Sequence, residues 1–204
     1  MTGLVTNFGE AWKDRKYENM ENYESIFQKR AAALFCVESA AIGGPPGSGF
    51  AVEIVLAHIG PRSAAGDEFH ILTDLYVKRA SALVPSESIS FRKEEDLLAW
   101  LNRKQGRTPA VAVLLDPRGR QMTSEALAGW VGERRDQGTR QLVFAIGPAD
   151  GWSEAARQRA QLLLSLGTLT MAHALARLVM AEQIYRACTI LAGHPYHRKA
   201  GNRD

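Results

Sequence analysis

Cysteine is scarce in this chain, and long apolar runs are missing. The 204 residues include only two cysteines, Cys36 and Cys188, without Cys-x-x-Cys spacing, which excludes a disulfide framework and a zinc-finger-type site. No apolar run approaches the ~20 residues that a membrane-spanning helix requires. Acidic residues crowd the N-terminus, where an export signal would need a basic start and an apolar core. These absences predict a cytoplasmic protein with no metal and no membrane partner.

The overall composition is that of a globular protein with a small positive charge. Hydrophobic residues make up 46% of the chain and charged residues 23%, and the formal net charge is +3, which excludes disorder throughout. The charge is uneven, because the segment from Trp152 to Asp204 holds seven basic residues against three acidic ones. This bias indicates either a docking site for an acidic partner or a solvated basic surface without a partner.

A stretch rich in glycine and proline separates two unequal parts of the chain. Residues Gly43 to Gly49 combine permissive glycines with two prolines that cannot continue a helix, as is typical of a linker. The domain is therefore expected at residues 51–204. Residues 1–50 are expected to be either a loosely attached extension outside the core or the product of a start codon placed too far upstream.

Short apolar runs alternate with helical patterns after the linker. This alternation predicts an α/β fold with a mainly parallel sheet and helices on both faces. The predicted strands are 52–58, 86–91, 110–115, 142–146 and, more weakly, 168–171. The predicted helices are 67–82, 93–104, 123–136, 153–166 and 172–191, the third with Thr123 as its N-cap.

Sheets of this class bind ligands at the carboxyl ends of their strands, so the loops that follow the last three strands are candidates for a site. The loops at 116–120 and 147–151 match neither the glycine pattern of dinucleotide-binding loops nor that of phosphate-binding loops. Ordinary connections are the alternative interpretation. The last helix adds the pair Glu182 and Arg186, four residues apart on one helix face, for which a surface ion pair is the alternative.

The end of the chain concentrates polar and aromatic groups. The sequence His194-Pro195-Tyr196-His197-Arg198 places two imidazoles, a phenol and a guanidinium within five residues. Aromatic and guanidinium planes stack on unpaired bases, arginine binds phosphate through two hydrogen bonds, and histidine accepts a proton near neutral pH. The segment is therefore either a nucleic-acid-binding and catalytic element or a disordered tail.

Several of these stretches together resemble a known family. They are Leu114-Leu115-Asp116 with the Gly119 turn, Ile146 to Gly151, Leu166 to Met171 leading into His173, and Ala181 to Ala187 with the terminal His194 to Arg198. This set, within residues 52–199, resembles the small SPOUT-class methyltransferases that methylate N3 of a pseudouridine in bacterial 23S ribosomal RNA.

The resemblance implies a C-terminal trefoil knot that holds S-adenosylmethionine, a ribosomal RNA substrate and an obligate homodimer. By position it implies that the cofactor contacts are Leu115, Gly147, Leu166, Gly167, Thr168, Leu169, Thr170 and Met171. It likewise implies a substrate side formed by Glu182, Arg186, Tyr196, His197 and Arg198, with the basic tail reaching across the dimer towards the partner's cofactor.

The chemistry implied is in-line attack of a uracil-type N3 on a sulfonium methyl group, without metal or covalent protein intermediate. Alignment of the reacting atoms is expected to contribute most, with His197 as the base that removes the N3 proton. Two departures from the family pattern, Pro148 and the alanines that flank His173, suggest as an alternative an RNA-binding protein that lost its cofactor. A phosphohydrolase is opposed by the lack of a carboxylate cluster for Mg²⁺.

Overall fold

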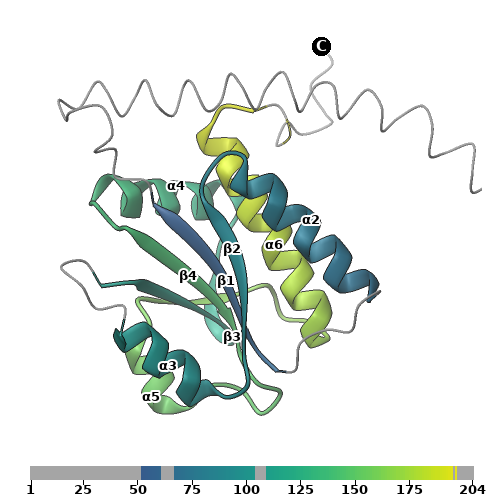
Figure 1. Ribbon diagram of the computed structural model, residues 1–204, viewed down its shortest axis with the longest axis vertical. Helices are drawn as coiled ribbons and strands as arrows, with labels where there is room; N and C mark the ends of the chain where they lie inside the picture. The colour runs from purple at the N-terminus through teal and green to yellow at the C-terminus, as the bar shows by residue number, and fades with distance from the viewer. Residues whose placement is uncertain (1–51, 61–66, 104–108, 195, 197–204) are drawn as a thin grey trace, which may run out of the picture.

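The computed structural model of the chain describes residues 52–60, 67–103, 109–194 and 196. Five parallel strands form one sheet in the order β2-β1-β4-β3-β5. The strands are β1 (Glu53–Ile59), β2 (Ser86–Phe91), β3 (Val111–Gln121), β4 (Gln141–Ile146) and β5 (Leu162–Ser165). The helices are α2 (Glu68–Ser81), α3 (Glu94–Arg103), α4 (Ser124–Asp136), α5 (Glu154–Arg159) and α6 (His173–Leu191), as Figure 1 shows. The predicted α/β class is confirmed.

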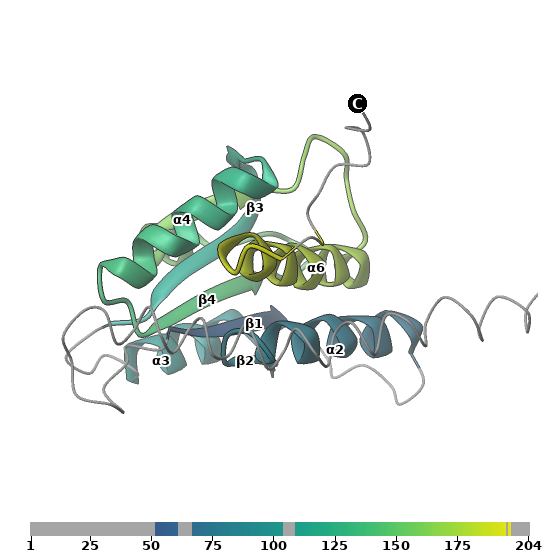
Figure 2. The same cartoon turned by 90° about the horizontal axis from the view of Figure 1, so that it is seen from above.

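Helices cover both faces of the sheet, as predicted. Successive side chains of a strand point to opposite faces, so Ile54 and Leu56 enter one core cluster while Val55 and Ala57 enter the other. The first cluster is completed by α2, α4 and α6, and the second by α3 and α5. Figure 2 shows α4 and α6 on one side of the sheet and α3 on the other. The central strands β1 and β4, buried on both faces, form the centre of the molecule.

Local sequence signals set most helix ends. The Thr123 hydroxyl accepts a hydrogen bond from the Ala126 amide at 3.1 Å, which confirms the predicted N-cap, and Asp67 and Ser153 cap α2 and α5 in the same way. The α6 helix instead starts after Ala172, which offers no side-chain cap. The first amides of α6 therefore receive no side-chain cap of the kind found at α2, α4 and α5.

The fifth strand was predicted at the wrong place. The strand is Leu162–Ser165, within the segment predicted as the second half of a helix, and residues 168–171 lie in the loop that follows it. The α5 helix ends early because Gln161 pairs with β3: its amide donates to the Ala112 carbonyl at 2.9 Å, and its side-chain oxygen accepts from the Ala112 amide at 2.6 Å. Tertiary pairing with a strand 49 residues earlier in the chain thus overrides the local helical pattern.

Residues 116–120 are not the loop that the sequence predicted. They continue β3 as an irregular strand, which leaves β4 after Leu115 and pairs with β5 through Arg120 and Gln121. Gly119 makes this possible, because a Cβ atom there would lie 2.6 Å from the backbone carbon of Leu163. Only glycine allows two backbones to approach so closely.

Other expectations concern the ends of the chain and its knot. Residues 1–50, with the predicted linker, lie outside the described residues, as do His197 and Arg198. The trefoil knot stays a prediction. No helix in the described part of the chain is long and apolar enough to cross a membrane.

Candidate functional site

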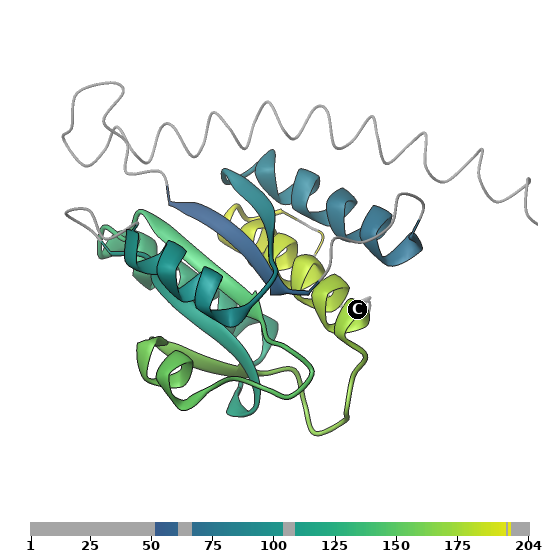
Figure 3. The same ribbon diagram turned by 60° about the horizontal axis from the view of Figure 1, so that its bottom comes forward.

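The predicted cofactor residues gather at the carboxyl edge of the sheet. Leu115 lies where β3 leaves β4, Gly147 follows β4 directly, and residues 166–171 belong to the connection between β5 and α6. Figure 3 shows this long connection running from β5 to the start of α6. Because β4, β3 and β5 are neighbours in a parallel sheet, their carboxyl ends bring the three segments to the same edge.

Trp152 fixes the ends of β3 and β4 relative to each other. Its indole Nε1 donates a hydrogen bond to the Leu115 carbonyl oxygen at 2.8 Å. The indole ring covers Gly147 so closely that a Cβ atom on this glycine would lie 2.8 Å from the ring. Trp152 is 4% exposed, and the sequence analysis did not assign it a role. The sequence spacing of Gly147 and Trp152 does not predict their contact, because only the folded loop turns the indole ring back onto the glycine.

The connection between β5 and α6 is open and weakly packed. Gly167 has a φ of 135°, a conformation that favours glycine, and no atom lies within 4 Å of where its Cβ would be. Thr168 and Thr170 are exposed, and Leu169 is 86% exposed. The open backbone at Gly167 leaves room for a ligand to approach closely. The predicted cofactor segment thus fits a group bound mainly through the backbone.

The buried carboxylate of Asp116 stabilises this edge of the sheet. Asp116 accepts a hydrogen bond from the Arg157 side chain at 2.8 Å and from the Arg118 amide at 2.9 Å, with the Arg118 Nε at 3.4 Å. Burial alone would raise the pKa of Asp116, but the bonds from Arg157 and Arg118 outweigh it and lower the pKa from 3.8 to about 2. The charged carboxylate therefore ties the end of β3 to α5, across the loop that contains Gly147.

Two histidines and an arginine lie where β1 meets the start of α6. The Arg177 guanidinium is 3.1 Å from His58 Nε2, and the rings of His58 and His173 are 6.0 Å apart. Burial and the charge of Arg177 lower the pKa of His173, against a hydrogen bond with the backbone of Gly147 that raises it. His173 is therefore neutral at pH 7 and links the start of α6 to the end of β4.

Three of the predicted substrate residues belong to the described part of the chain, and they lie together: Glu182 and Arg186 on α6, and Tyr196 packed against it. The Glu182 carboxylate forms an ion pair with Arg186 and accepts a hydrogen bond from the Tyr196 hydroxyl at 3.1 Å. The Arg186 guanidinium lies 4.8 Å from the centre of the Tyr196 ring, and the Tyr185 ring meets Tyr196 edge-on at the same distance. Tyr196 thus packs back against the preceding helix. Since both charged side chains are less than one third exposed, this is more than the surface ion pair considered as the alternative.

Two pKa shifts define the chemistry of this cluster, which we call the α6 cluster (Glu182, Tyr185, Arg186 and Tyr196). Burial would lower the pKa of Arg186, but the hydrogen bond and charge of Glu182 raise it, so the guanidinium stays charged. Burial, a hydrogen bond with Tyr76 and the charge of Glu182 raise the pKa of Tyr196, so its hydroxyl keeps its proton. The cluster offers a fixed cation and a neutral phenol beside an aromatic surface.

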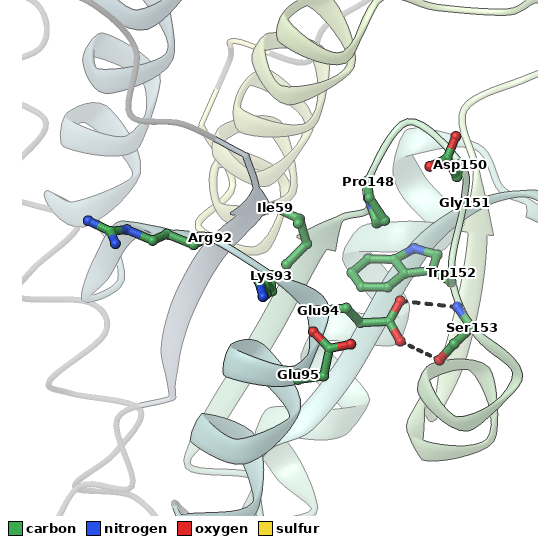
Figure 4. Close-up of a pocket in the computed structure, with 10 residues that line it drawn as sticks. All are labelled: Ile59, Arg92, Lys93, Glu94, Glu95, Pro148, Asp150, Gly151, Trp152 and Ser153. Atoms are coloured by element: carbon green, nitrogen blue, oxygen red, sulfur yellow. Dashed lines mark hydrogen bonds between the residues drawn. The ribbon is translucent and has the colours of Figure 1, made fainter.

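A groove of about 510 Å³ lies at the same edge of the sheet but does not contain the predicted cofactor residues. As Figure 4 shows, Ile59, Pro148 and Trp152 form its apolar wall, and Glu94 binds the amide of Ser153 at 3.0 Å. Its other lining residues are Arg92, Lys93, Glu95, Asp150, Gly151 and Ser153. Two cations face three carboxylates here, so the charge does not favour an RNA phosphate.

Metal-binding groups are not gathered at this edge. In the described ranges, no group of three or more His, Cys, Asp or Glu side chains is placed to hold a metal ion. The cysteine that the structure describes, Cys188, is buried, and burial raises its pKa to about 12. It is therefore a packing residue rather than a nucleophile.

These features define a class: a parallel α/β protein whose candidate ligand site lies at the carboxyl ends of three adjacent strands. The family described as "Predicted SPOUT methyltransferase" matches residues 53–197, which is more than half of the chain. The matched range includes every predicted site residue except Arg198. The chain belongs to the SPOUT methyltransferase family.

Individual relatives agree with this assignment. The protein named "Ribosomal RNA large subunit methyltransferase H" from Koribacter versatilis is 50% identical over 126 residues, which cover 62% of this chain and 86% of that one. The protein of the same name from Brucella ovis is 56% identical over 100 residues, which cover 48% of this chain and 59% of that one.

Solved structures are more distant. The SpoU methyltransferase AviRb from Streptomyces viridochromogenes, solved in complex with AdoMet, is 13% identical over 67% of this chain and 60% of that chain. Its TM-score is 0.38, which is too low to support a structural argument.

Proposed function

We propose that this protein methylates N3 of a pseudouridine in the 23S RNA of the large ribosomal subunit, with S-adenosylmethionine as methyl donor. The observation that carries the proposal is the 50% identity to a ribosomal RNA large subunit methyltransferase over 86% of that protein's length. The family resemblance of the loops and the tail supplies the finer statement about the base and the atom. Such a substrate places the protein in the cytoplasm, with the ribosomes.

The carboxyl edge of the sheet fits S-adenosylmethionine. The open Gly167 backbone and the exposed side chains of residues 168–170 leave space and free polar groups for a nucleoside. The carbonyl of Leu115 and the backbone of Gly147 are held in place by Trp152. The cofactor supplies an electrophilic methyl group, and we assign its binding to Leu115, Gly147 and Leu166 to Met171.

The two halves of the proposed site lie apart along α6. At 1.5 Å per residue, the α6 helix separates His173 from Glu182 by about 14 Å and from Arg186 by about 20 Å. Because α6 is a regular helix, this separation is fixed within one chain, and contact between two chains is a way to bring the halves together. We therefore propose a homodimer in which the α6 cluster of one protomer faces the cofactor loops of its partner.

An apolar surface on α2 is suited to this dimer. Four large apolar side chains on the first two turns of α2 and one on α6 are between 38% and 56% exposed: Phe69, Ile71, Leu72, Leu75 and Leu175. The two helices pack side by side, as Figure 1 shows. Soluble monomers rarely leave apolar side chains clustered in this way, so a second copy of the chain is the natural cover.

The residues of the α6 cluster and the tail have separate roles in the proposed reaction. Arg186 presents a fixed positive charge to the negative charge that develops on the base when N3 loses its proton. Tyr196 keeps its own proton and orients the base by stacking and through its bond to Glu182. His197 and Arg198 are proposed as the base and as a second cation. If His197→Ala keeps full single-turnover activity, the assignment of the base is wrong.

Cofactor binding is the first test. Calorimetric titration with S-adenosylmethionine is expected to show one site per protomer, which Gly167→Trp abolishes by filling the open backbone. Gly138→Trp is the matched control, because Gly138 also has a positive φ, of 79°, and open space around it, but lies beyond the end of α4. No binding to the unaltered protein would favour the RNA-binding alternative without a cofactor.

Complementation between inactive chains tests the shared site. Gly167→Trp and Glu182→Gln homodimers are each expected to methylate modification-deficient large subunits at least about 100-fold more slowly. A heterodimer has one site with an intact loop and an intact Glu182. Since random mixing makes about half of the dimers heterodimers, activity should return to roughly a quarter of the original value. A site contained within one chain would regain nothing on mixing.

The proposed interface has its own test. Leu72→Asp is expected to produce a monomer in light scattering and to lose activity, whereas Ser88→Asp, on exposed β2, is expected to change neither. A monomeric unaltered protein at micromolar concentration would contradict the dimer.

A further inference from the structure

The end of β3 carries arginine side chains that neither the cofactor loops nor the α6 cluster uses. After Leu115 the strand leaves β4 and continues along β5 to Gln121. The backbone at Gly119 lies against that of Leu163 and Leu164, so this extension is held closely against the sheet. A rigid backbone reduces the entropy that is lost when its side chains bind a ligand.

The charges on this extension do not balance. Asp116 is buried and is already paired with Arg157 at 2.8 Å, and the exposed Glu154 lies 4.0 Å from the same arginine. The Arg118 Nε reaches Asp116 only at 3.4 Å, and its side chain is 66% exposed. Arg120 is exposed, and among the described residues no partner for its guanidinium is found. Positive charge therefore faces the solvent at this point.

This positive charge lies next to the proposed cofactor loop. Arg120 pairs with Leu164 and Gln121 with Ser165, and β5 leads directly into Leu166. Neighbouring strands lie about 4.8 Å apart, so the backbone of Arg120 lies close to the start of the proposed cofactor loop. The groove near Trp152 offers no comparable surface, because its cations are outnumbered by carboxylates.

We propose that Arg118 and Arg120 bind phosphate groups of the RNA strand that flanks the target nucleotide. This inference rests on the proposed function for the identity of the substrate. The planar guanidinium fork donates two parallel hydrogen bonds to a phosphate, and such contacts set the position of the strand without reading its sequence. The extension of β3 thus aligns the substrate backbone, and the α6 cluster of the partner acts on the base.

The test compares two pairs of charge removals in the full-length protein. Arg118→Gln with Arg120→Gln removes the proposed contacts. Arg103→Gln with Arg140→Gln removes the same charge at the opposite edge, where α3 ends and β4 begins. The readouts are the equilibrium affinity for modification-deficient large ribosomal subunits across a salt series, the KM for the same particles, and the affinity for S-adenosylmethionine.

The first pair is expected to weaken subunit binding and raise KM by about 10-fold, and to reduce the slope of log affinity against log salt by about 1.4, or 0.7 for each single-strand phosphate contact. Cofactor affinity and the melting temperature are expected to stay unchanged, and the second pair is expected to behave as the unaltered protein. Equal losses in both pairs would show unspecific attraction and overturn the proposal, as would no loss in the first pair.

The same measurements separate this inference from the proposed function. If the unaltered protein binds large subunits but transfers no methyl group, the proposed function fails, while the comparison of binding still decides the role of the two arginines. If it binds no large subunits at all, both proposals fail.

Discussion

The carboxyl edge of the sheet and the α6 cluster are built in opposite ways. At the sheet edge, the proposed cofactor contacts are backbone groups of uncharged residues, and Trp152, Gly119 and the buried Asp116 hold this backbone in place. In the α6 cluster, the proposed chemistry belongs to side chains on a regular helix. The comparison indicates that the contacts which position the proposed cofactor site also stabilise the fold. The side chains of the α6 cluster, in contrast, can be substituted without loss of the fold. Changes at the edge should therefore reduce stability and cofactor binding together, and changes in the cluster should reduce turnover alone.

The largest effect is expected at Gly119. A methyl group in Gly119→Ala would lie 2.6 Å from the β5 backbone and must separate the two strands, at a cost of about 3 kcal/mol. For a domain of this size that lowers the melting temperature by about 10 °C. Calorimetry is expected to show this loss together with weaker binding of S-adenosylmethionine.

Gly129→Ala is the matched control for this prediction. Gly129 lies inside α4 with no atom within 4 Å of the position of a Cβ, so alanine should stabilise the helix by about 0.5–1 kcal/mol. If Gly119→Ala is as harmless as Gly129→Ala, the close approach of β3 and β5 is not required for the fold.

Asp116→Asn is expected to have the next largest effect. The difference between the ordinary pKa of 3.8 and about 2 corresponds to about 2.5 kcal/mol of stability at neutral pH. Because the pKa is lowered in the folded state, this contribution is fully present above pH 4 and is lost as the pH falls towards 2. Denaturant unfolding should therefore show a gap between the two proteins that closes between pH 4 and 2. A gap that is independent of pH would point to altered packing instead.

Trp152→Phe isolates one bond at the sheet edge. The ring that covers Gly147 is largely kept, but the hydrogen bond to the Leu115 carbonyl is lost, which should cost about 1 kcal/mol. Affinity for S-adenosylmethionine is expected to fall by several-fold in the same protein, as measured by calorimetry. Full stability with weakened cofactor binding would break the proposed coupling of fold and cofactor site.

Tyr196→Phe tests the α6 cluster and should have the smallest effect on the free energy of unfolding. The edge contact with Tyr185 remains, and only the hydrogen bonds of the hydroxyl with Glu182 and Tyr76 are removed, so the free energy of unfolding should change by no more than about 1 kcal/mol. Single-turnover methylation is expected to slow by about 10-fold or more at unchanged cofactor affinity. A loss of stability comparable to that of Asp116→Asn would remove the contrast between the two halves.

The sequence predicted the elements whose signals are local. The cap at Thr123 and the helices predicted at 93–104 and 123–136 depend on signals within one or two helix turns, and each lies where it was predicted. The pairing of Glu182 with Arg186 also follows from helix spacing. The contacts of His173 and Arg177 with His58, over 100 residues earlier, could not be inferred from such spacing.

Long-range contacts decided what the sequence predicted wrongly. Three consecutive leucines fit a buried strand or a buried helix equally well, and only pairing with Ala112 made them β5. The segment around Pro117 and Gly119 has the composition of a turn, yet it continues β3 because the β5 backbone lies against it. Trp152 became part of the site for the same reason, since its partner carbonyl is 37 residues away.

The amino-acid sequence by itself determined the α/β class, the order of strands and helices along the chain, and the loops and tail that carry the family resemblance. Those properties depend on periodicity, caps and short motifs, which act between residues close in sequence. The tertiary structure alone decided how Trp152 and Asp116 hold the strand ends together and that β3 continues along β5. These features depend on contacts between distant segments, which exist only after the sheet has formed.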